Sequence, residues 1–423
     1  MQALLLAAGK SSRFFPFNAK HKCAISLLGD PIIVHTVRAV KRAGINDIVI
    51  VVSPHSDFQE ILGNGKKYGV KINYVVQKEA TGMGDAILSA ASSLTSDFFL
   101  LNSYHVDFPE LKEELDKKRG TNKNVVLLTK EQEDVSSYGV ISFEGDNVTG
   151  LVEKPKKGME PSKLVVKGVY FLPLDFIREL KKTKKHHDNL EIAIDKYAKE
   201  GKVKFVKTQR ALVTLKYPWD LLTFKDFLLS KVTKSISKKA SVSKDALITG
   251  NVVIEEGAVV SERATIKGPA YIGKNAYIGS NTLIRNGTVL EERGVIGGFI
   301  EVKNTIIFEG AKTHSGVLED SIIGKNSRLG AGFTSANVRL DRKNITPNIF
   351  GEKIDSGFRD LGVIMGDSVM LGARVTTMPG VIIGNNVNIG PSTTVMENLD
   401  SDITFYTEFK KVIKKAKSAP IKK

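Results

Sequence analysis

The sequence predicts an α/β domain with a mainly parallel sheet, followed by a parallel β-helix. Up to about residue 232, short apolar runs alternate with amphipathic stretches, which is the order of strands and helices in a largely parallel sheet. From residue 240 onward a six-residue repeat takes over, and such a repeat indicates a stacked coil of short strands. The length of 423 residues also favours more than one domain. We therefore expect two domains, at residues 1–232 and 233–423.

The first domain contains five apolar runs that we expect to form strands. Two expected helices in this domain carry start signals: Asp30 precedes Pro31, and Asp188 with Glu191 three residues later matches a capping box. Ligands of open parallel sheets bind at the carboxyl ends of the strands, so the loop after the first run should lie at a site. The expected strands are at residues 3–9, 47–53, 72–77, 97–103 and 125–130.

The second domain repeats a six-residue unit whose third position is aliphatic in nearly every case. Three strands per coil would stack each of these side chains on its equivalent one coil away. A polar, non-repeating insertion at residues 333–361 interrupts the repeat. We expect a role for it in a substrate site, because long loops that leave a solenoid are more often functional than not; a structural or disordered excursion is the alternative. The third positions include Val242, Ile248, Ile254, Val260, Ile266, Ile272, Ile278, Ile284 and Leu290.

Composition restricts the partners of the chain. The formal net charge is +16, but the lysines are scattered, and the one dense run lies in the C-terminal tail at residues 410–423. This pattern favours a solvated basic tail and small anionic substrates over a nucleic acid. The single cysteine, Cys23, excludes an intramolecular disulfide, no secretory leader is recognisable, and no stretch has the roughly 20 apolar residues of a membrane span. We expect a cytoplasmic protein.

The loop after the first run has the chemistry of a phosphate site. A Gly/Ser turn at residues 9–12 exposes backbone N–H groups, and two cations, Arg13 and Lys22, follow. Such a loop can hold a triphosphate and stabilise the charge that develops on it during transfer. The residues therefore predict an enzyme that handles nucleotides.

The same segment resembles the sugar-1-phosphate nucleotidyltransferases. The resemblance rests on residues 6–13 (LAAGKSSR), on His21-Lys22 and on Gly29-Asp30-Pro31. It implies a Rossmann-like domain in which a pyrimidine nucleoside triphosphate and a sugar 1-phosphate give a nucleotide sugar and pyrophosphate. It further implies that two residues contact the phosphates in catalysis, Arg13 and Lys22, and that four bind the nucleotide, Ala8, Gly9, Ser11 and Ser12.

Further positions agree downstream. Gln77 and residues 81–86 (TGMGDA) are similar to the stretch with which this family reads a base, and residues 138–140 (YGV) and 153–155 (EKP) are similar to its sugar-site elements. The resemblance implies that Gln77, Gly82 and Met83 bind the nucleotide and that Gly139, Glu153 and Lys154 bind the sugar.

The family's metal-binding carboxylates are absent. Tyr104 and Thr214 stand at the positions where the family has its Mg²⁺ ligands, and Mg²⁺ prefers hard oxygen ligands, usually carboxylates. Asp107 is the remaining candidate ligand. Three interpretations stay open: an active nucleotidyltransferase, a nucleotide- or sugar-binding domain that no longer catalyses beside an active acyltransferase, and a non-catalytic assembly subunit.

The second half resembles the acetyltransferase domain of the bifunctional N-acetylglucosamine-1-phosphate uridyltransferase/glucosamine-1-phosphate acetyltransferases, especially the archaeal ones. Residues 313–324 (THSGVLEDSIIG), 329–332 (LGAG) and 336–339 (ANVR) carry this resemblance. It implies a left-handed parallel β-helix, acetyl-CoA as the acyl donor and a homotrimer that binds acetyl-CoA between neighbouring β-helices. The implied general base is His314, and the implied acetyl-CoA contacts are Ala331 and Asn337. The acyl acceptor stays open, since Val317 replaces the family's tyrosine.

Overall fold

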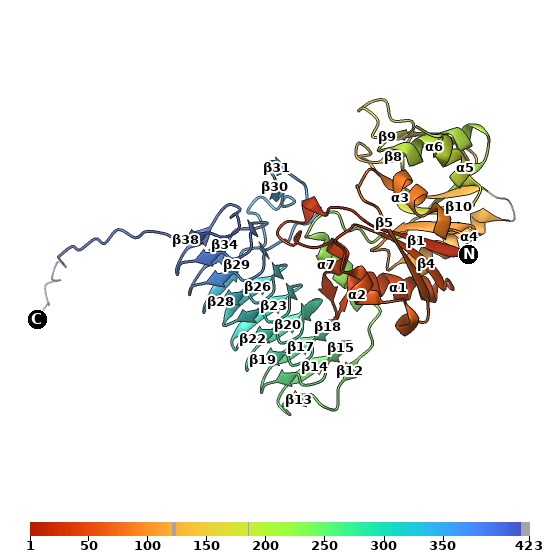
Figure 1. The fold of residues 1–423 in the computed structure, drawn as a ribbon. Coiled ribbons are helices and arrows are strands. Elements are labelled where there is room, and N and C mark those ends of the chain that lie inside the picture. The colour runs from red at the N-terminus through yellow and green to blue at the C-terminus, as the bar shows by residue number, and fades with distance from the viewer. Residues whose placement is uncertain (121–123, 185, 416–423) are drawn as a thin grey trace, which may run out of the picture. The chain divides into compact units, whose positions relative to one another are not determined.

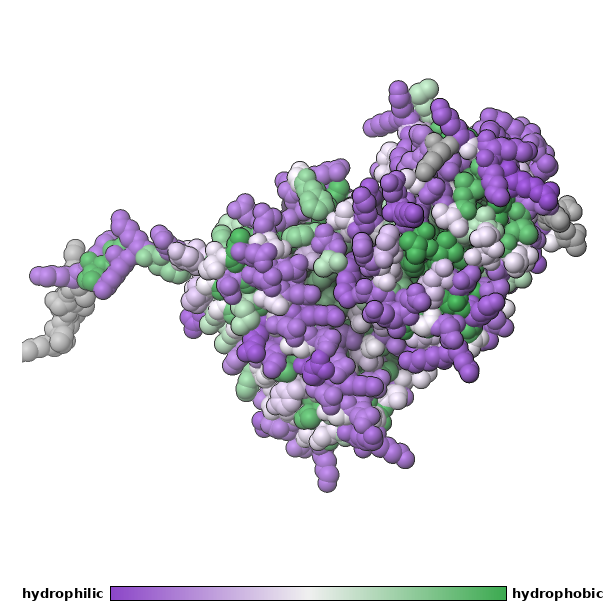
Figure 2. All heavy atoms as spheres, viewed as in Figure 1, coloured by the Kyte–Doolittle hydropathy of each residue, from purple (hydrophilic) through white to green (hydrophobic). Residues whose placement is uncertain are grey.

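The computed structural model describes residues 1–120, 124–184 and 186–415, and it divides into two compact units, Met1–Val232 and Thr233–Lys423 (Figure 1). Each unit is described by itself. No helix in the described ranges is long and apolar enough to cross a membrane. Figure 2 shows mostly hydrophilic residues on the visible face, with a green apolar area among them in the first unit.

The first unit is built on a nine-stranded sheet in the order β5-β4-β1-β6-β10-β7-β11-β9-β8. All five predicted strands are present, as β1, β4, β5, β6 and β7. The strands of this sheet are β1 (Gln2–Ala7), β4 (Asp47–Val52), β5 (Lys71–Val76), β6 (Phe98–Asn102), β7 (Val125–Glu131), β8 (Gly139–Glu144), β9 (Asn147–Glu153), β10 (Leu164–Leu172) and β11 (Val203–Lys207). A small hairpin pairs β2 (Ser26–Leu27) with β3 (Asp30–Pro31).

The sheet is parallel in the part that the sequence predicted and mixed elsewhere. The strands β5, β4, β1 and β6 are parallel neighbours, and β7 and β11 are parallel as well. The long strand β10 lies between β6 and β7 and runs antiparallel to both. The carboxyl ends of β1, β4, β5 and β6 therefore meet at one edge of the sheet, where a ligand site is expected.

Helices pack on the sheet in two groups (Figure 1). The helices α1 and α4 contact each other, and α4 also contacts β7 and β11. The helices α3, α5 and α6 contact one another, and α6 also contacts β9 and β11. The helices are α1 (Ile32–Arg42), α2 (Phe58–Leu62), α3 (Met83–Ser89), α4 (Phe108–Arg119), α5 (Phe176–Lys182), α6 (Asn189–Lys199) and α7 (Asp220–Leu229).

Neither of the two predicted side-chain caps forms, although Asp188 does occupy the N-cap position of α6. The helix α1 begins at Ile32, and the Asp30 carboxylate pairs with Arg38 at 2.6 Å instead of capping the helix. The helix α6 begins after Asp188, but its first turn has no side-chain cap, so the capping box with Glu191 does not form. The Asp188 and Glu191 carboxylates line a cavity instead.

The second unit is the predicted left-handed β-helix, with three sheets of stacked parallel strands. The first sheet contains β12 (Ser235–Ile236), β15 (Val252–Ile254), β18 (Ala270–Ile272), β21 (Thr288–Leu290), β24 (Ile306–Ile307), β27 (Ile322–Ile323), β32 (Ile364–Met365) and β35 (Ile382–Ile383). The second contains β13 (Ser241–Val242), β16 (Val259–Val260), β19 (Tyr277–Ile278), β22 (Val295–Ile296), β25 (Lys312–Thr313), β28 (Arg328–Leu329), β33 (Met370–Leu371), β36 (Asn388–Ile389) and β38 (Thr404–Phe405). The third contains β14 (Leu247–Thr249), β17 (Thr265–Lys267), β20 (Leu283–Arg285), β23 (Ile300–Lys303), β26 (Gly316–Glu319), β29 (Phe333–Ser335), β34 (Thr376–Thr377) and β37 (Thr394–Val395).

The aliphatic third positions stack as the repeat predicts. Val242 pairs with Val260, and Val260 with Ile278, along one sheet. Further along the chain the strict six-residue spacing ends. Leu290 pairs with Ile307, and Ile296 pairs with Thr313, so each partner comes one residue earlier than three units of six would place it. These coils are shorter than the earlier ones, so a polar threonine enters the stack directly before His314.

The polar insertion leaves the β-helix after β29. Phe333–Ser335 pairs with β26 and β34 and so belongs to the coil, and the excursion begins later than the residue 333 that the sequence suggested. Its hairpin pairs β30 (Asn348–Ile349) with β31 (Glu352–Lys353). Ile345 is buried, and the chain rejoins the coil where the Leu361 N–H donates to the Asn337 carbonyl at 2.8 Å.

Candidate functional site

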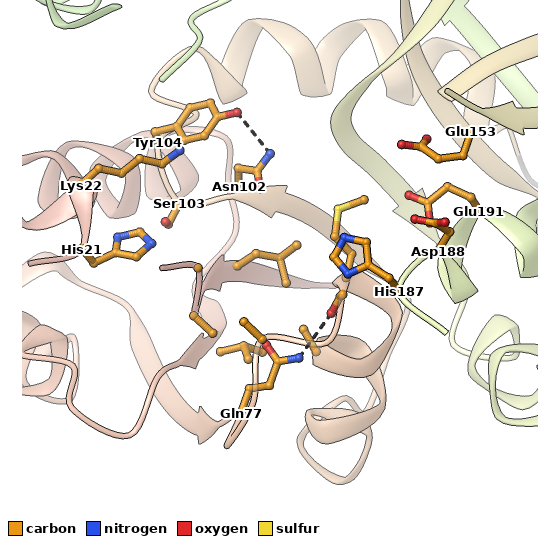
Figure 3. Close-up of a pocket in the computed structure, with 18 of the residues that line it drawn as sticks. His21, Lys22, Gln77, Asn102, Ser103, Tyr104, Glu153, His187, Asp188 and Glu191 are labelled. Carbon is orange, nitrogen blue, oxygen red and sulfur yellow. Dashed lines mark hydrogen bonds between the residues drawn. The ribbon is translucent and has the colours of Figure 1, made fainter. Parts of the chain in front are cut away.

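A cavity of about 310 Å³ lies at the carboxyl edge of the parallel strands in the first unit (Figure 3). Its wall combines strand ends, the loop after β6, the end of β9 and the start of α6. The lining residues are Leu6, Ala8, Gly9, His21, Lys22, Val51, Gln77, Ala80, Gly82, Met83, Ala86, Asn102, Ser103, Tyr104, Glu153, Lys154, His187, Asp188 and Glu191.

The cavity gathers many of the predicted site residues. Those that line it are Ala8, Gly9, Lys22, Gln77, Gly82, Met83, Glu153 and Lys154. Five others do not line it: Ser11, Ser12, Arg13, Asp107 and Gly139. The Ser11 hydroxyl accepts a hydrogen bond from the Lys22 N–H at 3.1 Å and so joins the loop to the second cation, while Arg13 is exposed in the short 3-10 helix Ser12–Phe14.

Gln77 is fixed where it meets α3. Its side-chain amide is buried and donates to the Asp85 carboxylate at 2.9 Å and to the Gly82 carbonyl at 3.3 Å. Gly82 has a φ of 121°, and a Cβ there would lie 2.2 Å from the His187 carbonyl oxygen, so only glycine fits. The turn before α3 is therefore held close to the segment that begins α6.

Lys22 supplies the cationic end of the cavity. Its ammonium donates to the Leu215 carbonyl and lies 5.0 Å from the centroid of the Tyr104 ring, a cation–π distance. Burial lowers the pKa of Lys22, and the Asp220 carboxylate opposes this shift. Burial also lowers the pKa of the adjacent His21 to about 3, so this imidazole is neutral at physiological pH.

The residues at the expected metal position do not fit a Mg²⁺ ion. Tyr104 is neutral, since burial raises the pKa of its phenol, and its hydroxyl accepts a hydrogen bond from the Asn102 amide at 3.3 Å. Thr214 is exposed and does not line the cavity. Asp107, the remaining candidate ligand, is buried; one of its oxygens contacts His105 at 3.0 Å, and the other accepts the Val213 N–H at 3.1 Å. Among the described residues, no group of three or more His, Cys, Asp or Glu could hold a metal ion.

Carboxylates form the other end of the cavity. Figure 3 shows Glu153, Asp188 and Glu191 together on the side opposite Lys22 and Tyr104. Burial raises the pKa of Glu191 to about 7, and the charges of Glu153 and Asp188 add to this shift. Burial likewise raises the pKa of Glu153, against the nearby Lys154 ammonium.

Sequence reasoning missed several members of this site. It took Asp188 and Glu191 for helix-capping residues, because acidic residues at a helix start usually have that role. It assigned no role in the site to His187, Asn102 or Ser103. The spacing of Asp188 and Glu191 was a usable signal, but it could not distinguish a cap from a pocket wall.

In the second unit, His314 is exposed at the end of β25. The hydroxyl of the next residue, Ser315, accepts the Gly332 N–H at 3.2 Å, so His314 and Ala331 lie at the same corner of successive coils. The neighbouring coil places Phe299 near this corner, where the Gly316 N–H donates to its carbonyl and its side chain is 75% exposed. An exposed imidazole and an exposed phenyl group thus share one corner.

Asn337 is held by acidic partners. Its amide donates to the Glu319 carboxylate at 3.1 Å and to the Asp320 carboxylate at 2.6 Å. These carboxylates are in turn paired with Arg285 at 3.2 Å and Lys303 at 2.8 Å. The network fixes Asn337 at the point where the insertion leaves the coil.

Comparison with known proteins connects both units to transferases. Residues 2–227 match the family model described as nucleotidyl transferase. Residues 269–298 match the hexapeptide repeat of succinyl-transferase, and residues 362–396 match the bacterial transferase hexapeptide.

Curated relatives match the whole chain. A "Bifunctional protein GlmU" of Methanocaldococcus jannaschii is 33% identical and one of Methanococcus maripaludis strain C5 is 32% identical; each alignment covers 99% of this chain and 100% of the relative. A "Bifunctional sugar-1-phosphate nucleotidylyltransferase/acetyltransferase" of Sulfurisphaera tokodaii is 32% identical, over 97% of this chain and 100% of that protein. The resemblance predicted from the motifs is confirmed.

Proposed function

The chain belongs to the nucleotidyl transferase family, among its bifunctional nucleotidylyltransferase/acetyltransferase members, and on that premise we propose a two-site transferase that acts on sugar phosphates. The first unit would join a pyrimidine nucleoside triphosphate to a sugar 1-phosphate and release pyrophosphate. The second unit would transfer the acetyl group of acetyl-CoA to a sugar amine. Acetylation would give an N-acetylated sugar phosphate, and nucleotidyl transfer would give the activated sugar itself, such as UDP-N-acetylglucosamine.

The observation that carries the first activity is the cavity itself. It brings Gly9, Lys22, Gln77, Gly82 and Glu153 to one place from segments far apart in the sequence. Backbone N–H groups and a lysine suit phosphates, a fixed amide suits the edge of a base, and carboxylates suit sugar hydroxyl groups.

The chemistry of the first unit is in-line displacement. A phosphate oxygen of the sugar 1-phosphate attacks the α-phosphorus of the triphosphate, and the bond to the β-phosphate breaks to release pyrophosphate. Lys22 and Arg13 offset the charge that develops on the phosphate oxygens. The family generally uses a divalent metal, but the residues at Tyr104, Asp107 and Thr214 do not fit one, so no step is assigned to it.

The chemistry of the second unit is acyl transfer at His314. The imidazole removes a proton from the sugar amine as its nitrogen attacks the thioester carbonyl; the carbon–sulfur bond then breaks, and coenzyme A leaves as the thiol. Ala331, at the same corner, and Asn337, at the start of the insertion, would contact acetyl-CoA.

A homotrimer would complete this second site. The corner at His314 is exposed on a single chain, and the exposed Phe299 beside it offers apolar area to a neighbouring copy. We expect light scattering to give three chains per particle and acetyl transfer per chain to fall when dilution separates them. A fully active monomer would contradict the trimer.

Two assays test the whole proposal. Incubation with UTP or dTTP and a sugar 1-phosphate should release pyrophosphate, and incubation with acetyl-CoA and an amino-sugar phosphate should release free coenzyme A. Nucleotide binding without pyrophosphate release would leave the first unit as a binding domain. Absence of both activities would favour an assembly subunit.

A further inference from the structure

The chain that follows β38 combines basic and apolar side chains. Residues 406–415, here named the tail segment, begin directly after Phe405, where the last strand of the β-helix ends. From the lysines alone the sequence favours a solvated tail. The apolar side chains between the lysines do not fit that interpretation. The tail segment contains Tyr406, Phe409, Val412 and Ile413 together with Lys410, Lys411, Lys414 and Lys415.

The apolar side chains of the tail segment are exposed to solvent. The exposed fraction is 59% for Tyr406, 71% for Phe409, 66% for Val412 and 79% for Ile413. Residues 408–415 make no hydrogen bond or ion pair with any other residue that the structure describes. Single exposed apolar residues are ordinary, but four of them in so short a segment form a surface that water disfavours. The tail segment therefore presents an apolar surface that no described residue covers.

The β-helix does not need the tail segment to cover its own core. In the last coil, Val395 is fully buried, and Ile389 and Leu399 are buried as well. The chain is still bound to the coil at Thr407, whose N–H donates to the Thr393 hydroxyl at 3.2 Å. From there to residue 415 it has no regular structure. A partner for the apolar surface must therefore come from outside this coil.

The two kinds of side chain have the spacing of an amphipathic helix. An α-helix advances about 100° per residue, so the four apolar side chains of the tail segment would fall within an arc of about 120°. The four lysines would lie on the opposite side. So short a helix is only marginally stable in water, which agrees with the absence of regular structure at residues 406–415. A surface that accepts the apolar face would stabilise the helix.

Charge and composition identify that surface as an anionic membrane. The tail segment has four lysines and one acidic residue, Glu408, and residues 416–423, which lie outside the described ranges, add three lysines. Residues 406–423 contain no arginine, the side chain that binds nucleic-acid phosphates best. A nucleic acid would also leave the apolar face in water. A membrane interface accepts both faces, because apolar side chains enter between the head groups while lysines bind the lipid phosphates.

We propose that the tail segment binds an anionic membrane surface as an amphipathic helix. Phe409, Val412 and Ile413 enter the head-group region, and the lysines contact lipid phosphates. The segment lies on the membrane and does not span it, in agreement with the lack of a membrane-spanning helix in the described ranges. It holds both transferase units at the membrane and takes part in neither reaction. The homotrimer proposed above carries three such segments, which strengthens the binding.

Sedimentation of the full chain with lipid vesicles tests this proposal. Vesicles of equal parts phosphatidylglycerol and phosphatidylcholine should bind the wild type and vesicles of phosphatidylcholine alone should not, because each lysine contributes about fivefold to partitioning onto an anionic surface. The double variant Phe409→Ser/Ile413→Ser keeps the charge and should bind about 10- to 100-fold more weakly, since two apolar side chains are lost. The matched control is Met396→Ser, at an apolar residue of the last coil that is 74% exposed, and it should bind like the wild type.

Three results would overturn the proposal. The first is equal binding to both kinds of vesicle, and the second is unchanged binding of the double serine variant. The third is binding of an oligonucleotide, but not of anionic vesicles, by the wild type and the double variant alike, which would make the tail segment a site for nucleic acid. Release of pyrophosphate and of coenzyme A should be the same in the wild type and both variants, which shows that the two units remain folded.

Tryptophan fluorescence tests the helical face separately. Phe409→Trp and Lys411→Trp place a probe on opposite sides of the helix, and Trp219, which is buried in the first unit, gives a constant background. With excess anionic vesicles, the emission of Phe409→Trp should shift to shorter wavelength and that of Lys411→Trp should not. Equal shifts would contradict the helix. A shift of Phe409→Trp without lipid that grows with protein concentration would show that a second copy covers the apolar face, and the membrane proposal would fail.

Discussion

The two units build their sites in opposite ways. In the first unit, loops and helix starts at one sheet edge enclose a cavity, so that a single chain supplies both of its ends. In the second unit, regular coils put His314 on an exposed corner, with the exposed Phe299 on the coil before it. A layered α/β fold concentrates side chains from distant segments, whereas a solenoid distributes them along its surface. The first site should therefore be complete within one chain and the second should depend on a neighbour.

The difference between the two units is tested most directly by a substitution of His314. His314→Ala should reduce coenzyme A release by about 10²- to 10⁴-fold, the range for loss of a general base. Pyrophosphate release should not change, because His314 belongs to the other unit. Lys312→Ala, at an exposed residue of the strand β25 that directly precedes His314, is the control and should leave both reactions intact. Unchanged coenzyme A release in His314→Ala would end the assignment.

The reciprocal experiment is made at Lys22. Lys22→Met should lower pyrophosphate release by about 10²- to 10³-fold, because a fixed charge that stabilises the developing phosphate charge is lost. Coenzyme A release should be unaffected. Lys20→Met removes a lysine two residues away that pairs with Asp57 at the surface, and it should have little effect. Equal rates in Lys22→Met and Lys20→Met would show that the cationic end is not used.

The Glu191 carboxyl in the cavity should make the free energy of unfolding of the first unit depend on pH. The Glu191 carboxyl ionises near pH 4.5 in the unfolded chain, and burial raises its pKa to about 7 in the folded chain. The folded state therefore holds the extra proton between these values, and the contribution of Glu191 to the free energy of unfolding is lost as the pH rises through 7. This loss amounts to about 3 kcal/mol.

Glu191→Gln should remove this pH dependence. The variant should match the wild type near pH 4 and be more stable than it at pH 8. Urea titrations followed by the fluorescence of Trp219, the single tryptophan of the chain, report on the first unit alone. A stability difference between the two proteins that stays constant from pH 4 to pH 8 would contradict the shifted pKa.

The two units also differ in how far their sequences predict them. The β-helix can be predicted from its repeat, because an aliphatic third position stacks on the equivalent position of the next coil, as Val242 does on Val260. Of the five strands that the sequence predicts, β1, β4, β6 and β7 follow from almost continuous burial, whereas β5 is a largely exposed edge strand that is recognised by its apolar run alone. The strands β8 and β9 were missed because they are partly exposed, as at Phe143 and Val152, and so lack a continuous apolar run.

The candidate sites were predictable where a backbone requirement marks them and not where a side chain has two possible roles. Glycine is required at position 82 by its φ and by the nearby His187 carbonyl, and this residue, a predicted nucleotide contact, lines the cavity. Asp107 lies only three residues from Tyr104, yet the turn after β6 directs it to His105 and Val213. Sequence spacing does not contain that direction, because it depends on packing against a segment more than a hundred residues away.

The smallest expected effect is a difference in the free energy of unfolding between two serine-to-glycine variants, one from each unit. Ser11 and Ser392 both have a left-handed backbone, with φ of 51° and 54°. Replacement by glycine relieves the same strain and costs the same unfolded-state entropy at both positions. Only Ser11 contributes a side-chain hydrogen bond that the substitution removes, the one that its hydroxyl accepts from the Lys22 N–H at 3.1 Å. Ser11→Gly should therefore lower the free energy of unfolding of its unit by about 1 kcal/mol more than Ser392→Gly does. Calorimetry resolves the two transitions once Trp219 fluorescence has assigned the first, and equal shifts would mean that the hydroxyl of Ser11 does not stabilise the phosphate loop.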